Sequence, residues 1–126
     1  MIEALIQAAE ARGYRIRWHR GGPKAAWVPS QNTITVQIGM DDATTLCSLA
    51  HELGHAHYGD APTGNGHLDQ RQEQRADMYA ARLLISPVEF EAAVIWHQDH
   101  LPAIADELEV TQHLLNTWLR NTQLAA

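Results

Sequence analysis

The sequence Leu49-Ala-His-Glu-Leu-Gly-His-Ala-His-Tyr-Gly59 places three histidines and a glutamate within seven residues. On an α-helix, residues four apart lie one turn above each other on the same face. His51 and His55 can therefore present two imidazoles to one metal ion. Glu52 lies next to that face, close enough to contact a water molecule bound to the ion. The stretch predicts a helix that carries two metal ligands.

The spacing matches the His-Glu-x-x-His pattern of zinc peptidases. The chain has 8 histidines in 126 residues, so a chance match is easier than usual. On a helical wheel at about 100° per residue, three leucines fall opposite the two histidines: Leu46, Leu49 and Leu53. An exposed helix that carries polar side chains without binding metal would give the same wheel. The prediction of a metal site therefore depends on a third ligand.

Glu73, on a second predicted helix, is the best candidate for that ligand. A catalytic zinc ion commonly has three protein ligands and a fourth position for water. Asp77 lies one turn further on the same face, and Ala76 and Ala80 would let this helix approach the histidine helix closely. We expect Glu73 to bind the metal. We expect Asp77 to accept the free ring N–H of a ligand histidine, His51.

Two questions about this site stay open. The oxyanion of peptide hydrolysis usually needs one further donor, and the sequence offers four candidates: Tyr58, Tyr79, His57 and His67. If Glu73 does not bind the metal, Asp77 and His67 are the alternative third ligands. Taken alone, Glu-x-x-Ala-Asp is typical of an ordinary solvated helix, so the prediction rests on its combination with the histidine pair.

Composition limits the partners and the compartment. The formal net charge is −6, and one lysine and eight arginines form no cluster, which argues against direct binding of nucleic acid. The one cysteine, Cys47, excludes an internal disulfide and is expected to be a small buried residue. No apolar run approaches a membrane span, and the N-terminus lacks the basic start of a signal peptide. We therefore expect a cytoplasmic protein without a membrane partner.

The hydrophobic pattern predicts an α+β fold in one domain, residues 1–126. Residues 1–40 would form a helix and a small sheet, 41–86 the metal-site helices, and 87–126 a helical C-terminal part. Strands at 14–18, 25–28 and 33–38 predict a three-stranded antiparallel sheet packed on about five helices. We expect strand 33–38 at the sheet edge beside the cleft, where a substrate peptide could add as a further strand. Helices are predicted at 2–12, 41–58, 69–85, 101–108 and 112–120, and a further helix is predicted to begin at residue 87.

Together the two motifs resemble those of the ImmA/IrrE family of zinc metallopeptidases. Members carry His-Glu-Leu-Gly-His, then a helix of the form Glu-x-x-Ala-x-x-Phe-Ala-x-x-Leu-Leu-Met-Pro. Here the second motif runs from Glu73 to Pro87; Tyr79 replaces the phenylalanine, and one residue is inserted before the proline. The stretch Leu108–Thr111 is similar to the family's C-terminal part, where Val-Ser often opens a helix. The resemblance covers residues 44–120, and neither departure touches an expected ligand.

This resemblance implies a minimal zincin-like fold and a zinc-dependent endopeptidase. It implies that His51, His55 and Glu73 bind one Zn²⁺ per chain and that Glu52 is catalytic. Known members act on transcriptional regulators. The implied partner is therefore a protein substrate, such as a repressor or another transcriptional regulator.

Two other functions fit parts of the sequence. A metal-binding regulatory or interaction protein without peptidase activity would keep the three ligands but would not need Glu52. A DNA-binding module would use the helices at 102–120, which have the length of a helix-turn-helix. The last helix offers only Arg120 as a cation, and acidic residues before it would repel phosphate. The presence of Glu52 favours the enzyme.

Overall fold

The computed structural model describes residues 1–125, and their fold is α+β, as predicted. Within these residues, no helix is both long and apolar enough to cross a bilayer. The elements in chain order are α1 (Ile2–Ala11), β1 (Arg15–His19), β2 (Ala25–Val28), the 3₁₀ turn η1 (Pro29–Gln31), β3 (Thr33–Gln37), α2 (Asp42–Tyr58), α3 (Gly66–Leu84), α4 (Pro87–His97), α5 (Leu101–Glu107) and α6 (Gln112–Ala125).

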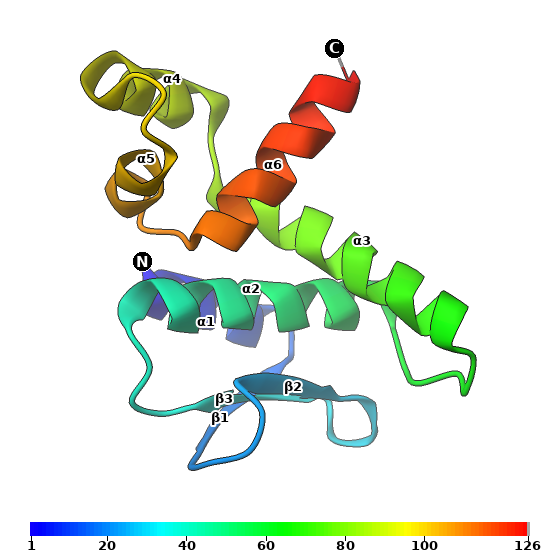
Figure 1. Ribbon diagram of the computed structural model, residues 1–126. Helices are drawn as coiled ribbons and strands as arrows, with labels where there is room; N and C mark the ends of the chain where they lie inside the picture. The colour runs from blue at the N-terminus through cyan, green and yellow to red at the C-terminus, as the bar shows by residue number, and fades with distance from the viewer. Residues whose placement is uncertain (126) are drawn as a thin grey trace.

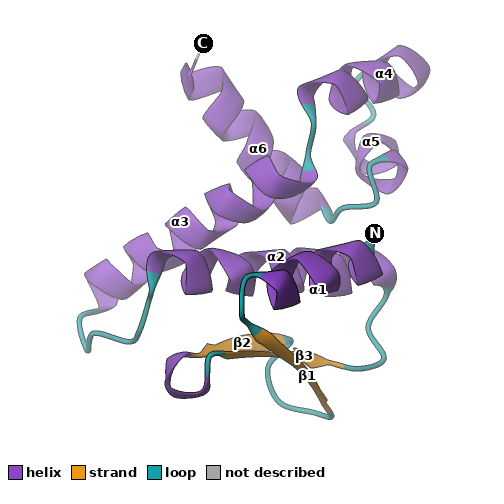
Figure 2. Ribbon diagram, turned by 180° about the vertical axis from the view of Figure 1, so that it is seen from behind, coloured by secondary structure: helices purple, strands orange, loops and turns teal. Residues whose placement is uncertain are grey.

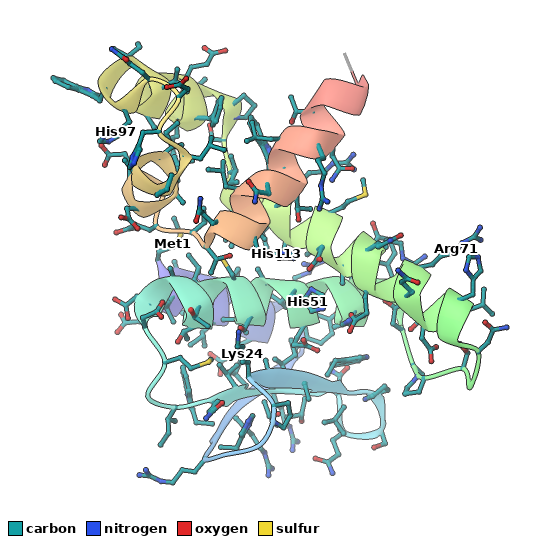
Figure 3. All side chains as sticks on the ribbon, viewed as in Figure 1. Met1, Lys24, His51, Arg71, His97 and His113 are labelled. Carbon is teal, nitrogen blue, oxygen red and sulfur yellow. The ribbon has the colours of Figure 1, made fainter. Side chains whose placement is uncertain are left out.

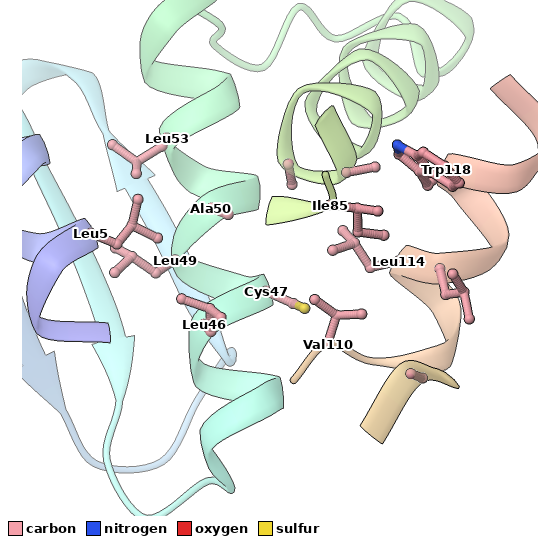
Figure 4. Packing of buried hydrophobic residues seen from close by; sticks show 14 of the residues in the cluster. Leu5, Leu46, Cys47, Leu49, Ala50, Leu53, Ile85, Val110, Leu114 and Trp118 are labelled. Atoms are coloured by element: carbon pink, nitrogen blue, oxygen red, sulfur yellow. The ribbon is translucent and has the colours of Figure 1, made fainter. Parts of the chain in front are cut away.

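Helix α2 runs through the middle of the molecule (Figures 1 and 2). The sheet and α1 lie on one side of it, and the C-terminal helices lie on the other (Figure 4). Leu46, Leu49 and Leu53 face the first side and are at most 3% exposed. Cys47 faces Val110 on the second side and is buried, as predicted. Because two sides of α2 are covered, the polar face with the histidines is the face left to form a site.

The sheet is mixed, which corrects the prediction of a purely antiparallel sheet. The strand order is β1-β3-β2, with β1 parallel to β3 and β2 antiparallel to it. The chain leaves β1 through Gly21 and Gly22, both at positive φ, and crosses to the far side of β3. The central position goes to the strand whose side chains are most deeply buried, since Ile34 and Val36 are 0% exposed.

The prediction that strand 33–38 forms the sheet edge is wrong. β3 pairs with β1 along one side and with β2 along the other, so its backbone groups are already used. Alternation along a strand predicts which residues are buried, but it does not predict which strands become neighbours. Among the described strands, β2 is the edge strand that packs against α2.

Both ends of α2 are capped. At the start, Asp41 Oδ1 accepts a hydrogen bond from the Thr44 N–H at 2.8 Å. At the end, Gly59 takes the left-handed conformation with φ 65°. The next residue turns back, so that the Asp60 N–H donates to the carbonyl oxygen of His55 at 2.9 Å. The C-terminal cap therefore places Asp60 beside the second histidine.

Helix α3 begins earlier than predicted, at Gly66 instead of 69. The reason is Asn65, whose side chain accepts hydrogen bonds from the backbone N–H groups of His67 and Leu68. Helix α4 begins at Pro87 as predicted, with Ser86 accepting a hydrogen bond from the Glu89 N–H.

Helices α2 and α3 approach each other closely at Gly54. A Cβ atom added to Gly54 would lie 3.0 Å from both the Cα and the carbonyl oxygen of Ala76, and 3.2 Å from Cβ of Tyr79. Ala76 and Ala80, the two alanines expected to allow a close approach, are both 0% exposed. Small residues on both helices therefore set the distance between the histidines of α2 and the carboxylates of α3.

Substituting Gly54→Ala is expected to destabilise the protein by about 1–3 kcal/mol, the usual cost of overpacking. Alanine favours a helix over glycine by only about 0.5–1 kcal/mol, and the backbone of Ala76 cannot move aside as a flexible side chain would. Urea unfolding would measure the difference. Gly66→Ala is the matched control, because an added Cβ there has no neighbour within 4 Å. Equal stability of the two variants would contradict the close approach.

Candidate metal centre

The side chains of His51, His55 and Glu73 meet at one point between α2 and α3. The Nε2 atoms of the two histidines lie 3.2 Å apart. Glu73 Oε2 lies 2.9 Å from Nε2 of His51 and 2.5 Å from Nε2 of His55. The histidine side chains are 21% and 12% exposed, whereas Glu73 is 60% exposed. The structure thus brings together the three residues selected from the sequence as ligands.

The other ring nitrogen of each histidine faces a carboxylate. Nδ1 of His51 lies 2.8 Å from Asp77 Oδ1, and Nδ1 of His55 lies 2.9 Å from Asp60 Oδ2. An ionised carboxylate can only accept, so each Nδ1 carries a hydrogen and donates it. When both rings are neutral, as metal binding requires, each Nε2 atom has a lone pair free for the ion. Two nitrogen atoms that can bind a metal and a carboxylate oxygen therefore converge on one point.

This donor set fits a metal ion, because three converging electron-pair donors need a positive charge between them. Tetrahedral zinc ligands at about 2.0–2.1 Å from the ion lie about 3.3 Å from each other. The two Nε2 atoms lie 3.2 Å apart, and the Glu73 oxygen lies closer to them, at 2.9 and 2.5 Å. Ligand atoms of His51, Glu52 and His55 also lie within 4.8 Å of one another. Two imidazoles and one carboxylate leave a coordination position open, as in catalytic zinc sites.

Electrostatics around His51 also favour a cation. Burial lowers the pKa of His51, but the hydrogen bond to Asp77 and the charges of Glu52, Asp77 and Glu73 outweigh it. Together they raise the pKa from 6.5 to about 9. Negative surroundings that hold a proton on this ring at neutral pH also favour a metal ion at the same place.

Asp60 is a site residue that the sequence reasoning missed. Its side chain is 4% exposed and contacts both His55 and the guanidinium of Arg75, which lies 2.5 Å from Oδ1. Arg75 in turn lies over the ring of Tyr58, 4.0 Å from its centroid. A buried carboxylate held in this way fixes the orientation of the His55 ring. Its position directly after the left-handed Gly59 was the available signal, because that cap turns the chain back toward the helix.

His113 is the second residue that was missed. Its Nε2 lies 3.0 Å from Asp77 Oδ2, while Asp77 Oδ1 contacts His51. Figure 3 shows His113, at the start of α6, close to His51 on α2. Burial acts to raise the pKa of Asp77, but the hydrogen bonds from His51 and His113 outweigh it and hold that pKa below its ordinary value. Asp77 is therefore ionised at neutral pH and links a residue of α6 to the candidate metal centre.

Glu52 lies where two cavities meet. One, of about 440 Å³, is lined by His51, Asp77, His113 and Lys24, among others. The second, of about 400 Å³, is lined by His55, Glu73 and residues 25–27 of β2. Burial raises the pKa of Glu52 above its ordinary value; the neighbouring histidines oppose this change, and the charge of Glu73 adds to it. A carboxylate with a raised pKa is a stronger base.

The candidate oxyanion donors predicted from the sequence lie elsewhere. His57, Tyr58 and Tyr79 form an aromatic cluster, with ring centroids 4.8–6.2 Å apart, and the Tyr79 hydroxyl accepts a hydrogen bond from Arg12. None of the three lines either cavity beside Glu52. His67 is exposed in the first turn of α3. Lys24 and His113, by contrast, line one of the cavities that Glu52 also lines.

A His-Glu-x-x-His helix opposite a carboxylate on a second helix, in an α+β fold, is the arrangement of a metal-dependent peptidase. The chain belongs to the Peptidase_M78 family, because the model of the IrrE N-terminal-like domain matches residues 6–117. The resemblance to the ImmA/IrrE family is thereby confirmed. A comparison with curated proteins finds no match.

Proposed function

We propose that the protein is a zinc-dependent endopeptidase, with one Zn²⁺ bound by His51, His55 and Glu73. The observation that carries the proposal is the convergence of the two Nε2 atoms and one carboxylate oxygen, with atoms 2.5–3.2 Å apart. Membership of a peptidase family supports the reaction class. Asp77 and Asp60 would orient the two rings and increase their basicity.

When bound, zinc would lower the pKa of a water molecule to about 7 and polarise the substrate carbonyl. Glu52 accepts the proton of the attacking water and later passes it to the leaving amine. The raised pKa of Glu52 suits both steps, because a proton-transfer group works best when its pKa lies near the working pH. Burial of the carboxylate thus contributes directly to its role as general base.

We propose further that the substrate is a transcriptional regulator cleaved in the cytoplasm. The support is the family resemblance, and the test is a search for new protein N-termini. Extract from cells that encode the protein would be incubated with the zinc-loaded enzyme or with Glu52→Gln, and new termini would be identified by mass spectrometry. We expect cleavage of few proteins, a regulator among them, and none with Glu52→Gln. Identical termini in both incubations would refute the endopeptidase function.

We propose that an extended substrate binds along strand β2. Residues 25–27 line the cavity that contains Glu52, His55 and Glu73. The carbonyl oxygen of Lys24 accepts a hydrogen bond from Gln37 of β3 at 2.8 Å. Backbone groups alternate along an antiparallel strand, so Ala26 bonds to β3, while Ala25 and Trp27 direct their backbone groups outward. A peptide could add to this outer edge as a fourth strand.

Substituting Ala25→Pro is expected to reduce cleavage of the substrate roughly 2- to 10-fold, the value of one backbone hydrogen bond. The change removes an outward N–H and leaves the β2–β3 ladder intact, because edge strands tolerate proline at such positions. Ala26→Pro is the comparison, since it removes a ladder bond and should lower the unfolding temperature. Unchanged cleavage by Ala25→Pro would exclude β2 as the binding edge.

A further inference from the structure

Helix α4 is apolar around most of its circumference, yet the side chains that the structure describes cover it on one side only. On the inner side, Ala93 is 2% exposed, and the ring of Phe90 lies 4.8 Å from the ring of Trp118 on α6. On the outer side, Val88, Ile95 and Trp96 are 75%, 79% and 80% exposed. A helix that is apolar all round is normally buried on all sides. The outer side of α4 therefore carries the apolar side chains of a buried surface, but these side chains are exposed.

The exposed side chains form one continuous face, which we call the apolar stripe: Val88, Ala92, Ile95 and Trp96. At about 100° per residue, the four positions fall within about 100° of one another on the helical wheel. Glu89 and Glu91 are exposed and fall at the two edges of this arc. Single exposed apolar residues are ordinary, but a contiguous apolar face with a polar border is typical of an interaction surface.

The charge around the apolar stripe has one sign. Residues 86–111, which comprise α4 and α5 and which we call the acidic lobe, contain six acidic residues and no lysine or arginine. In the rest of the chain, nine acidic residues balance nine basic ones, so the lobe accounts for the whole net charge of −6. The lobe lies on the side of α2 away from the sheet (Figures 1 and 2). The histidine His97 belongs to it (Figure 3), close to Glu107.

We propose that the apolar stripe docks a basic amphipathic helix of a partner protein. The partner's apolar residues would cover Val88, Ile95 and Trp96, and its lysines or arginines would meet Glu89 and Glu91 at the two edges. Binding of an amphipathic helix through an apolar face is a recurring mode of recognition. The negative charge around the stripe favours a partner helix with positive charge. The inference concerns binding alone and stands whether or not the chain hydrolyses peptides.

The same charge pattern argues against the other occupants. A second copy would bring two lobes with six acidic residues each into contact, and like charges disfavour such an interface. An anionic membrane surface attracts basic segments and would repel this one. Nucleic acid would be repelled for the same reason. The apolar stripe favours a partner with an apolar face, and its acidic border favours one that is also cationic. A cationic amphipathic protein segment has both properties.

The test uses a synthetic probe, a helical peptide of about 18 residues, or five turns, with leucines on one face and lysines on the other. A peptide with glutamates in place of the lysines is its matched control. Binding to the Glu52→Gln protein, which should not degrade the probe, would be followed by fluorescence anisotropy of the labelled peptide. Trp96→Ala removes the largest side chain of the stripe, which is 80% exposed, and Trp18→Ala removes a tryptophan that is 48% exposed on β1.

We expect the lysine peptide to bind, and Trp96→Ala to weaken binding about tenfold or more, as for a central interface tryptophan. The double variant Glu89→Gln/Glu91→Gln and added salt should also weaken binding, whereas Trp18→Ala should not. Circular dichroism would show that the variants keep their fold, which is expected because these side chains lie outside the core.

Four results would overturn the proposal. The glutamate peptide could bind as tightly as the lysine peptide, which would remove the charge preference. Trp96→Ala could bind the lysine peptide as tightly as the parent. Light scattering could show a dimer that Trp96→Ala dissociates, so that a second copy occupies the stripe. Vesicles of phosphatidylcholine with phosphatidylglycerol could bind the parent but not Trp96→Ala, which would make the stripe a membrane contact.

Discussion

Glu73→Gln is expected to lower zinc affinity by more than about 100-fold, so that the purified variant loses its metal on dialysis. The amide keeps the shape of the side chain but has no charge, and its oxygen is a much weaker ligand than the carboxylate that lies 2.5–2.9 Å from both Nε2 atoms. Loss of an outer partner alone typically costs about 10- to 100-fold in affinity, and loss of a direct ligand should cost more. Zinc per chain and chelator competition would measure the effect.

Two further variants make this test specific. Asp60→Asn removes the carboxylate behind His55 and should weaken zinc binding by about 10- to 100-fold, less than Glu73→Gln. Glu91→Gln makes the same charge change on the exposed side of α4 and should retain about one zinc per chain, like the parent. If Glu73→Gln binds zinc as tightly as Glu91→Gln does, Glu73 is not a ligand.

Glu52→Gln is expected to reduce peptide hydrolysis by about 10²- to 10⁴-fold in kcat, the usual contribution of a general acid–base group. Zinc content should stay near that of the parent, because Glu52 is assigned to proton transfer and not to the metal. Measuring kcat together with zinc content separates a role in proton transfer from a role in metal binding. Activity that survives in Glu52→Gln would show that another group takes the proton.

The same variant should also change stability in a definite direction. Burial raises the pKa of Glu52 in the folded state, so ionising it costs folding free energy at pH values above its unfolded pKa. The metal-free Glu52→Gln protein should therefore unfold at a higher temperature than the metal-free parent near neutral pH. The difference should shrink as the pH falls and Glu52 becomes protonated in both states. A less stable variant at neutral pH would contradict the raised pKa.

The sequence predicted the features that depend on residues close together in the chain. Helix α2, with the leucine face that is now buried, follows from a repeat of three and four residues. Its ends follow from Asp41 and Gly59, whose side-chain and backbone preferences act locally. The position of Glu73 opposite the histidines was also expected, because its helix follows α2 directly and carries two alanines for close packing.

The features that the sequence did not predict depend on tertiary contacts. The mixed sheet required β2 to cross to the far side of β3, and the strand pattern contains no information about that crossing. His113 is 36 residues from Asp77 in the chain, so only the packing of α6 on α3 brings it to the site. Asp60 lies near His55 in sequence, but its role required a turn that reverses the chain.

A crystal of the protein grown with zinc tests the central claim most directly, through an anomalous difference map at the zinc absorption edge. We predict one strong peak per chain, about 2.0–2.2 Å from Nε2 of His51, Nε2 of His55 and a carboxylate oxygen of Glu73. Asp77 and Asp60 should contact the outer ring nitrogens in the same crystal. A map without a peak between α2 and α3, or with its peak bound by other residues, would contradict the proposed metal centre.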